Sequence, residues 1–553
     1  METTGCPTEG EPLKGGEDGG ETGPGQAQAP APPATELKRG CKEVLGLSKL
    51  THWRTAVFFL SLFLCLTVVF AFSFIIPCPV RPQYIASWNR TFSGAKTYDF
   101  LAFEDASKDK VMDVLLVVKD TEASPNNTCG NAGLPSPCVF MLAVDGTDGE
   151  TLWERPLDPD FHWAQCGLDT NTGQKWDCLL FHSDQLSALD KSNGEVRWQR
   201  PQPPGLHSSV PVLSVPDLDG DKVSDVALVA SDSVQTQLVF LSGGTGIQIG
   251  STVALNATQT AGHLLHTTGE GAQYLLLQKD TGLYGLALWR IAAKAKEGLQ
   301  AGLKKANQME RKAAATSGLV PVYESDSLRR VVRTDKDQTS NLMLVTGSEV
   351  VLIDGKTLQP LWTFNTTTVF REPAFGHFNK DGVLDVVLEE DMDNSTKRVL
   401  IVDGKSGAVL WNVDLLSSAD TPRPTSVHTI NSVSIFVFWG LLPQQHNSSV
   451  PSAGERRSYM LHPLYSNVLL QSENVMDHII TFKATLMERG RHAAFILLTG
   501  PGTEDTEGTV VLSKWKLKHD VPQSTVCPIG DGKSSDTENS IKEAFNRLRF
   551  SDN

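Results

Sequence analysis

The sequence lacks the short motifs by which most enzyme classes are recognised. It has no G-x-S-x-G nucleophile elbow, no H-E-x-x-H zinc helix, no P-loop and no G-x-G-x-x-G after a strand. Its 13 histidines show no pairing at ligand spacing, and its nine cysteines include no C-x-x-C pair, which argues against zinc and dithiol redox chemistry. Acids are plentiful, so a carboxylate pair for glycoside hydrolysis stays open.

Positive charge is also scarce. Lys and Arg number 49 against 64 Asp and Glu, which leaves a net charge of −15. Because nucleic-acid affinity depends on basic residues that neutralise phosphates, this balance argues against a nucleic-acid partner. It suits an acidic, cation-binding globular domain.

We identify one long uncharged apolar run, residues 55–76. At 1.5 Å per residue its 22 residues span about 33 Å, enough to cross a bilayer core. A cleaved signal peptide is the alternative, but its apolar region would begin earlier and be shorter. We therefore expect a transmembrane signal anchor that holds the protein in a lipid bilayer.

The flanking charges and the glycosylation sequons predict the same orientation. Lys38, Arg39, Lys42, Lys49 and Arg54 precede the run, whereas only Arg81, Arg90 and Lys96 follow it closely. The positive-inside rule then places the amino terminus in the cytosol. Six N-x-Ser/Thr sequons all follow the run: Asn89, Asn126, Asn256, Asn365, Asn394 and Asn447. The sequence predicts a single-pass type II membrane glycoprotein, with the plasma membrane favoured over other secretory membranes.

Six of the cysteines follow the membrane run, where the compartment would be oxidising. Six cysteines allow 15 pairings. We expect Cys129–Cys138 and Cys166–Cys178 to close short local loops, and Cys78–Cys527 to tie the two ends of the ectodomain together. The alternative for Cys78, beside the bilayer, is a free or palmitoylated thiol.

One acidic loop, DLDGDKVSD, predicts a cation site. Asp217, Asp219, Asp221 and Asp225 occupy positions 1, 3, 5 and 9, and Val223 at position 7 can offer its carbonyl. A Ca²⁺ ion takes six to eight oxygen ligands, and acids on alternate positions of a tight loop can supply them. The alternative is a solvated acidic turn.

The acidic loop recurs, each time before a strand rich in Val and Leu. The loop at 105–113 places Asp105, Ser107, Asp109, Val111 and Asp113 in the same positions. The loop at 377–385 keeps Asn379, Asp381, Val383 and Asp385 but begins with His377, and the loop at 333–341 carries Arg333 where a ligand is needed. We rank the expected Ca²⁺ occupancy in that order and expect no cation in the last loop.

A second repeat, D-x-x-x-G-x-x-x-W, alternates with the loops. It is complete at Asp145–Trp153, Asp190–Trp198 and Asp403–Trp411, lacks its glycine at Asp354–Trp362, and keeps only its centre at Ser242–Gly250. Each copy joins two apolar strands through a Gly-containing turn, which is typical of a β-hairpin. Periods of 45 and 49 residues between starts indicate propeller blades, with the Trp packed between neighbouring blades.

The acidic loops resemble the FG-GAP repeats of integrin α-chain propellers, with FSGAK at 92–96 and AFGHF at 374–378 as worn copies of the name-giving motif. The hairpins are similar to the blades of quinoprotein propellers. Over residues 40–550 the chain resembles the integrin-α FG-GAP repeat-containing membrane proteins, in particular the family with sequence similarity 234. The resemblance implies an all-β fold, a β-propeller of about seven or eight blades.

The predicted organisation follows from these features. Residues 1–54 form a disordered cytosolic tail ending in a basic strip, 55–76 the anchor, 77–530 the propeller, and 531–553 a polar tail. Residues 291–316, rich in Ala and Lys, predict an exposed helical insertion that Gly298 and Gly302 weaken.

Three functional hypotheses remain. We favour a non-enzymatic ectodomain that binds a protein or glycan, stiffened by structural Ca²⁺. The alternatives are a membrane-complex or trafficking subunit acting through its cytosolic tail, and a quinone-dependent or hydrolytic enzyme.

Overall fold

The structure is a computed structural model of the whole chain. It describes residues 52–75 and 87–551, apart from 121–127, 135–136, 158–159, 169–177, 204–207, 232–234, 256, 258–259, 393–394, 417–420, 444–454, 489–491, 502–507 and 531–535.

The chain divides into two units, and the first contains one described helix. This helix, α1, spans His52–Ile75. Its segment His52–Phe70 has a mean hydropathy of 2.0 and is long and apolar enough to cross a membrane. The helix is a candidate membrane anchor.

The second unit, residues 82–553, is built almost entirely of antiparallel strands. Five sheets have four strands in chain order. One sheet contains β5 (Phe161–Cys166), β6 (Cys178–His182), β7 (Gln185–Leu189) and β8 (Val196–Pro201), and the next contains β9 (Ser208–Val215), β10 (Asp225–Ser231), β11 (Thr236–Leu241) and β12 (Gln248–Ala254). A further sheet contains β13 (Gly262–Thr267), β14 (Gln273–Lys279), β15 (Gly282–Ala287) and β16 (Leu319–Glu324), and it is followed by the sheet of β17 (Arg330–Arg333), β18 (Leu342–Val345), β19 (Glu349–Ile353) and β20 (Pro360–Asn365). The last of the five contains β21 (Ala374–Gly376), β22 (Asp385–Asp391), β23 (Thr396–Val402) and β24 (Val409–Leu416).

Two larger sheets complete the unit. A five-stranded sheet adds β32 (Thr525–Pro528) to the edge of β25 (Thr425–His428), β26 (Ser434–Gly440), β27 (Arg457–Leu461) and β28 (Val468–Gln471). A seven-stranded sheet has the order β29-β30-β31-β1-β2-β3-β4. Its strands are β29 (His478–Glu488), β30 (His492–Gly500), β31 (Gly508–Lys516), β1 (Ser87–Glu104), β2 (Asp113–Asp120), β3 (Val139–Val144) and β4 (Thr151–Leu157).

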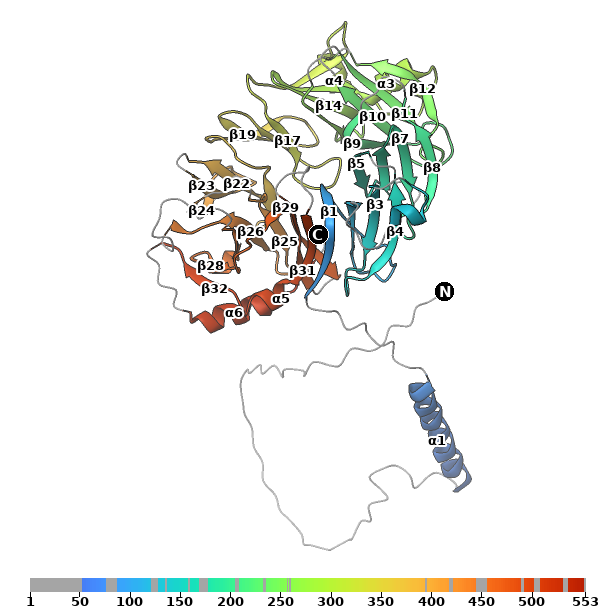
Figure 1. Cartoon of the computed structure of the whole chain (residues 1–553), viewed down its shortest axis with the longest axis vertical. Coiled ribbons are helices and arrows are strands. Elements are labelled where there is room, and N and C mark those ends of the chain that lie inside the picture. The colour runs from blue at the N-terminus through green and yellow to red at the C-terminus, as the bar shows by residue number, and fades with distance from the viewer. Residues whose placement is uncertain are drawn as a thin grey trace, which may run out of the picture. The chain divides into compact units, whose positions relative to one another are not determined.

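Strand β1 joins the two ends of the propeller. Its first half, Ser87–Ala95, pairs with β31, whereas its second half, Ala95–Glu104, pairs with β2. Figure 1 shows β1 (blue) between the C-terminal strands (red) and the strands that follow it (cyan). We interpret the seven-stranded sheet as two four-stranded blades that share β1, an interpretation that gives eight blades.

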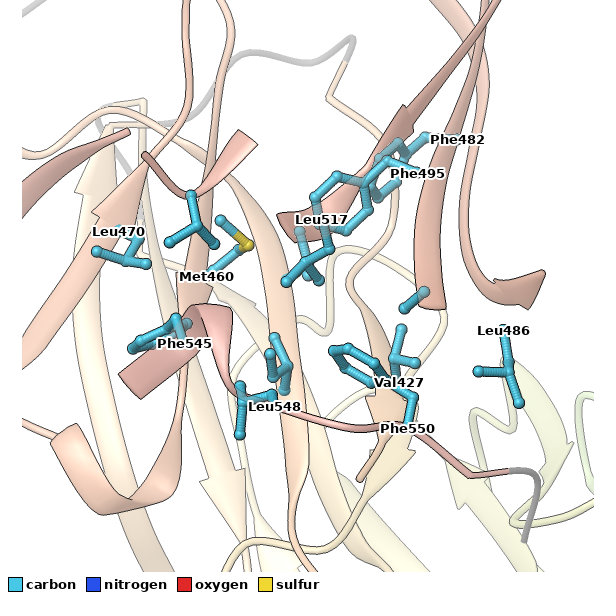
Figure 2. Packing of buried hydrophobic residues seen from close by; sticks show 14 of the residues in the cluster. Val427, Met460, Leu470, Phe482, Leu486, Phe495, Leu517, Phe545, Leu548 and Phe550 are labelled. Atoms are coloured by element: carbon cyan, nitrogen blue, oxygen red, sulfur yellow. The ribbon is translucent and has the colours of Figure 1, made fainter. Parts of the chain in front are cut away.

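The cores lie between sheets. Eight buried apolar clusters fill the interfaces between consecutive sheets, and one of them joins β29–β31 to β2 and β3. Figure 2 shows the cluster between β25–β28 and β29–β31, in which Phe482 and Phe495 from one sheet and Met460 and Leu470 from the other contribute apolar side chains. This cyclic order of interfaces is that of a β-propeller, so the predicted all-β propeller is confirmed.

The tryptophans of the hairpin repeat pack between sheets, as predicted. Each indole Nε1 donates to a backbone carbonyl in the turn of the next sheet: Trp153 to Lys191 (2.8 Å), Trp198 to Gly243 (3.0 Å) and Trp362 to Gly404 (2.8 Å). The turn glycine lies directly under the ring, because a Cβ at Gly194 would stand 2.6 Å from Trp153.

This docking explains the two incomplete repeats. Gly246 stays in the copy without a tryptophan because Trp198 of the preceding sheet covers it. Conversely, Leu358 replaces the glycine in the copy at Asp354–Trp362, where it keeps the left-handed backbone (φ 54°) and is buried in the apolar cluster with β13–β16. No tryptophan is available there, since β16 carries none.

The structure corrects two boundaries. Residues 291–316 do not form one exposed helix: α3 (Leu288–Ala295) buries Ile291, Ala292 and Ala295, and α4 (Asn307–Lys312) is separate. Gly298, with φ of 89°, lies in the turn between them, and the insertion falls between two strands of one sheet.

The polar tail expected at 531–553 packs on the propeller as well. Helix α6 (Glu538–Asn546), which follows the short helix α5 (Leu517–Asp520), buries Ile541 and Phe545, and Phe550 forms a β-bridge with Thr429. The apolar residues of α6 recur at helical spacing and face the cluster of Figure 2.

We predict that Gly194→Ala destabilises the protein through its clash with Trp153. Overpacking of this kind costs about 1–3 kcal/mol, in addition to the strain of a Cβ at φ of 69°. Gly298→Ala is the matched control, because its φ of 89° imposes the same strain with no atom within 4 Å. Thermal unfolding followed by circular dichroism should show a clearly lower Tm for Gly194→Ala than for Gly298→Ala. Equal Tm values would contradict the docking role.

We predict that His462 makes stability depend on pH. Its Nδ1 accepts from the Leu464 N–H (3.2 Å), its ring packs edge-on against Phe545, and burial lowers its pKa from 6.5 to about 4. Since the unfolded chain binds the proton first, stability should fall by up to about 3 kcal/mol as pH drops from 6.5 to 4. His462→Asn, which keeps an acceptor, should lose this component. Parallel Tm-versus-pH curves for the wild type and the variant would contradict this role of His462.

Candidate metal centre

The acidic loop at 217–225 lies between β9 and β10 and brings three carboxylates together. One oxygen from each of Asp217, Asp219 and Asp225 lies within 4.8 Å of the others, a gathering of His, Cys, Asp or Glu groups that is unique in the part of the chain that the structure describes. Oxygens that share a Ca²⁺ ion at about 2.3–2.6 Å are at most about 5 Å apart. The geometry of this loop therefore fits a divalent cation.

The loop backbone turns its amides onto its own carboxylates. Asp217 accepts from the Gly220 and Lys222 N–H groups (2.6 and 2.8 Å), and Asp221 accepts from the Val223 N–H (2.7 Å). Gly220 and Lys222 have positive φ values of 88° and 69°. Because carboxylate oxygens have two lone pairs each, these bonds orient the acids and leave capacity for a cation.

Position 9 has a structural role that sequence reasoning missed. Asp225 is fully buried; its Oδ1 accepts from Gly243 (3.0 Å) in the next hairpin turn, and its Oδ2 accepts from Leu218 (2.6 Å). Burial, with Asp219 and Asp221 nearby, raises the pKa of Asp225 to about 6, although the two backbone bonds oppose this shift. Asp225 thus connects the candidate cation loop to the hairpin turn of its sheet.

The hydrogen bond from a hairpin-turn N–H to the side chain at position 9 recurs in every acidic loop. Gly146 N–H donates to Asp113 (2.9 Å), Gly404 to Asp385 (3.1 Å) and Gly355 to Asn341 (2.9 Å). The sequence signal for this role was present: Asn341 retains an acceptor at position 9 in the loop that carries Arg333 at position 1. Position 9 therefore joins loop to hairpin whether or not a cation binds.

The loop at 105–113 contains buried side-chain oxygens that lack a hydrogen-bond partner in the described part of the chain. Asp105 Oδ1 and Ser107 Oγ are buried and have no hydrogen-bond partner among the described residues. Asp109 accepts from the Val111 N–H (2.7 Å), and Lys108 and Lys110 adopt the positive φ values seen in the first loop. Two unpaired buried oxygens at predicted ligand positions favour a cation here too.

The loop at 377–385 satisfies its own polar groups. His377 Nδ1 lies 3.0 Å from the Val383 carbonyl, the oxygen expected at position 7 of a cation site. Asn379 Nδ2 donates to Asp403 (3.1 Å), and Asp381 accepts from the Val383 N–H (2.8 Å). This geometry favours a cation least among the three candidate loops.

The predicted modification sites are spread over the propeller. Asn89 lies on β1 and Asn365 ends β20, both exposed, while Asn126, Asn256, Asn394 and Asn447 lie outside the described residues. Cys129 and Cys138, and likewise Cys166 and Cys178, are joined at disulfide distance. Cys527 is buried on β32, but Cys78 lies outside the described residues, so their pairing stays a prediction.

A cavity of about 1040 Å³ lies where the first strands of several sheets meet. Arg330, Arg371, Arg423 and Lys483 line it together with Asp99, Glu104 and Glu372. Arg423 pairs with Glu372, and burial near Arg423 lowers the pKa of Lys483 to about 8. Sequence reasoning could not find this group, because its members come from strands and loops far apart in the chain.

Comparison with known proteins agrees with the fold. Residues 88–551 match the family model "FAM234A/B beta-propeller". The chain is similar to Protein FAM234A of Bos taurus (37% identical, covering 91% of this chain and 92% of that protein) and of Homo sapiens (36%, 91% and 92%). Protein FAM234B of Homo sapiens is 26% identical over 92% of this chain and 85% of its own length.

Similarity to solved structures is weaker. The WD40 domain of SCAP from fission yeast aligns with a TM-score of 0.41 and 10% identity, covering 77% of this chain and 98% of that domain. Quinohemoprotein alcohol dehydrogenase from Comamonas testosteroni aligns at 0.37 and 10%, covering 79% and 78%. Neither likeness supports a functional argument. The match over nearly the whole propeller shows that the chain belongs to the FAM234A/B β-propeller family.

Proposed function

We propose that this protein is a non-enzymatic, single-pass type II membrane glycoprotein whose propeller, stabilised by Ca²⁺, binds a protein or glycan partner outside the cytosol. The gathering of three carboxylates at 217–225 carries the calcium part of the proposal. The rigid ring of interfaces and the charged cavity support the binding part.

The cation would act on stability rather than on chemistry. Asp217 and Asp219 are exposed, so the ion would bind at the propeller surface, where Asp225 connects the loop to the Gly243 turn. An ion that binds only the folded state stabilises it by about 2.7 kcal/mol at a concentration 100 times its Kd. The orphaned oxygens of Asp105 and Ser107 support a second, weaker site.

The membrane orientation rests on three observations. The apolar helix α1 follows a basic strip, and the sequons all lie on its carboxyl side. The paired cysteines Cys129–Cys138 and Cys166–Cys178 are typical of an oxidising compartment. Together they favour a cytosolic amino terminus and a propeller at the cell surface or in a secretory lumen.

The charged central cavity is the surface that we favour for the partner. Arg330 has an exposed side chain without an ion pair among the described residues, and it shares the cavity with Arg371 and Arg423. Arginine is well suited to bind carboxylates through paired hydrogen bonds. An acidic segment of a partner protein or an acidic sugar fits this lining.

We predict that Ca²⁺ raises the Tm of the purified protein and that a chelator reverses the shift. Asp217→Asn combined with Asp219→Asn should remove most of this shift, because it removes two charged ligands of the best-formed site. Asp335→Asn, in the loop that carries Arg333, is the control and should keep the full shift. Differential scanning calorimetry with and without Ca²⁺ measures all three. An unchanged shift in the double variant would overturn the site.

We predict that the partner is recognised outside the cytosol. Proximity labelling on intact cells, with the labelling enzyme fused after residue 553, should mark the same neighbours when residues 1–54 are replaced by an unrelated tail. Charge reversal at Arg330 and Arg423 should reduce that labelling, whereas Arg398→Glu, on the exposed Asp414 pair, should not. Loss of the neighbours on tail replacement alone would favour the trafficking-subunit hypothesis instead.

A further inference from the structure

A second cavity, of about 560 Å³, lies between the sheet of β25–β28 and strands β29–β31. Its apolar part is formed by Trp439, Phe482 and Phe495, which belong to the cluster of Figure 2, where Phe482 and Phe495 lie side by side. Its polar part includes Glu473, Asp520 and other side chains of the loops beside these strands. Aromatic and polar groups therefore share one open space.

Trp439 is an unsatisfied donor in the lining of this cavity. It is 1% exposed and packs edge-on against Phe482, yet its Nε1 has no acceptor among the described residues. Trp153, Trp198, Trp362 and Trp411 all donate to backbone carbonyls. The Nε1 atom itself is closed to solvent, so Trp439 offers the cavity an aromatic surface rather than a hydrogen-bond donor.

The polar lining selects the chemistry of the ligand. Glu473, Asp477 and Asp520 contribute acceptors, and among the described residues the lining contains His519 but neither Lys nor Arg. Burial and Glu473 raise the pKa of Asp520 to about 6, which is consistent with a carboxyl group that lacks a cationic partner. The acids disfavour an anionic ligand, and a simple cation would leave the aromatic side chains of the lining uncovered. A saccharide supplies hydroxyl donors for the acids and C–H faces for the aromatic rings.

The chain itself provides a saccharide at this place. Asn89, the asparagine of the sequon Asn-Arg-Thr, lines the same cavity from β1, as does Ser87. We propose that the glycan attached to Asn89 lies in this cavity and fills the space between the last two sheets. The inference rests on the proposed topology, since only a lumenal propeller meets the glycosylation machinery.

Attachment needs a lipid-diphosphate-linked oligosaccharide as donor. The anomeric carbon of its first sugar forms a bond to the Asn89 side-chain nitrogen as its bond to the diphosphate oxygen breaks. The nitrogen loses one proton, and the lipid diphosphate leaves. The sugar then occupies the cavity as the two sheets pack together.

Asn365 provides an internal control on the same molecule. It is an exposed sequon asparagine at the end of β20 and lines none of the cavities described above. A glycan at Asn365 should extend into solvent, so it should differ from the Asn89 glycan in accessibility alone.

The test is native deglycosylation of full-length protein from mammalian cells, with site occupancy followed by mass spectrometry. We expect the Asn89 glycan to be released at least ten times more slowly than the Asn365 glycan in the folded protein, and at the same rate after denaturation. Trp439→Phe should accelerate release at Asn89 only. Gln523→Ala, an exposed change in the lining, should act in the same direction without disturbing the core.

Three results would overturn the inference, and they are distinguishable. A glycan at Asn365 with none at Asn89, or equal native release at both sites, would refute the cavity assignment and leave the topology intact. Absence of glycan at all six sequons would refute the proposed topology together with the inference.

Discussion

Closure of the ring is the constraint on which the rest of the structure depends. Each sheet has two apolar faces and buries them only against its neighbours, so a single unpaired sheet would expose a whole core face. Strand β1 prevents this because it pairs with β31 through one half and with β2 through the other. The apolar cluster around Trp88, Val114 and Leu498 then forms the same kind of interface as the other seven.

The hairpin turns and the acidic loops act on the same interfaces from adjacent positions. A tryptophan of one sheet covers the turn of the next, and the residue at position 9 of the acidic loop bonds to that turn within its own sheet. In the sheet of β9–β12 both contacts meet at Gly243, whose carbonyl accepts from Trp198 and whose N–H donates to Asp225. A cation at Asp217 and Asp219 would therefore stabilise a turn on which the neighbouring sheet depends.

The two cavities differ in chemistry in a way that separates their proposed roles. The central cavity gathers Arg330, Arg371 and Arg423 and suits an acidic partner. The cavity between the last two sheets contains carboxylates and aromatic side chains, and suits a neutral, hydroxyl-rich ligand. The first would serve recognition, whereas the second would complete the packing of the fold.

Local patterns were enough to predict the repeated elements, because hairpins and acidic loops are defined by residues close together in the chain. The propeller and the packing of Trp153 and Trp198 between sheets both followed from such spacing. Local patterns misjudged 291–316 and 531–553, where Ile291, Phe545 and Phe550 are buried by surfaces that come from distant strands.

Only the tertiary structure decided which groups meet across the ring. Arg330 and Lys483 share a cavity although about 150 residues separate them, and Asn89 lies beside a cavity that also contains Trp439. His377 differs from Asp217 by its bond to the Val383 carbonyl, which no spacing rule reveals. Such contacts depend on how the ring of sheets closes, since closure pairs the first strand, β1, with β31.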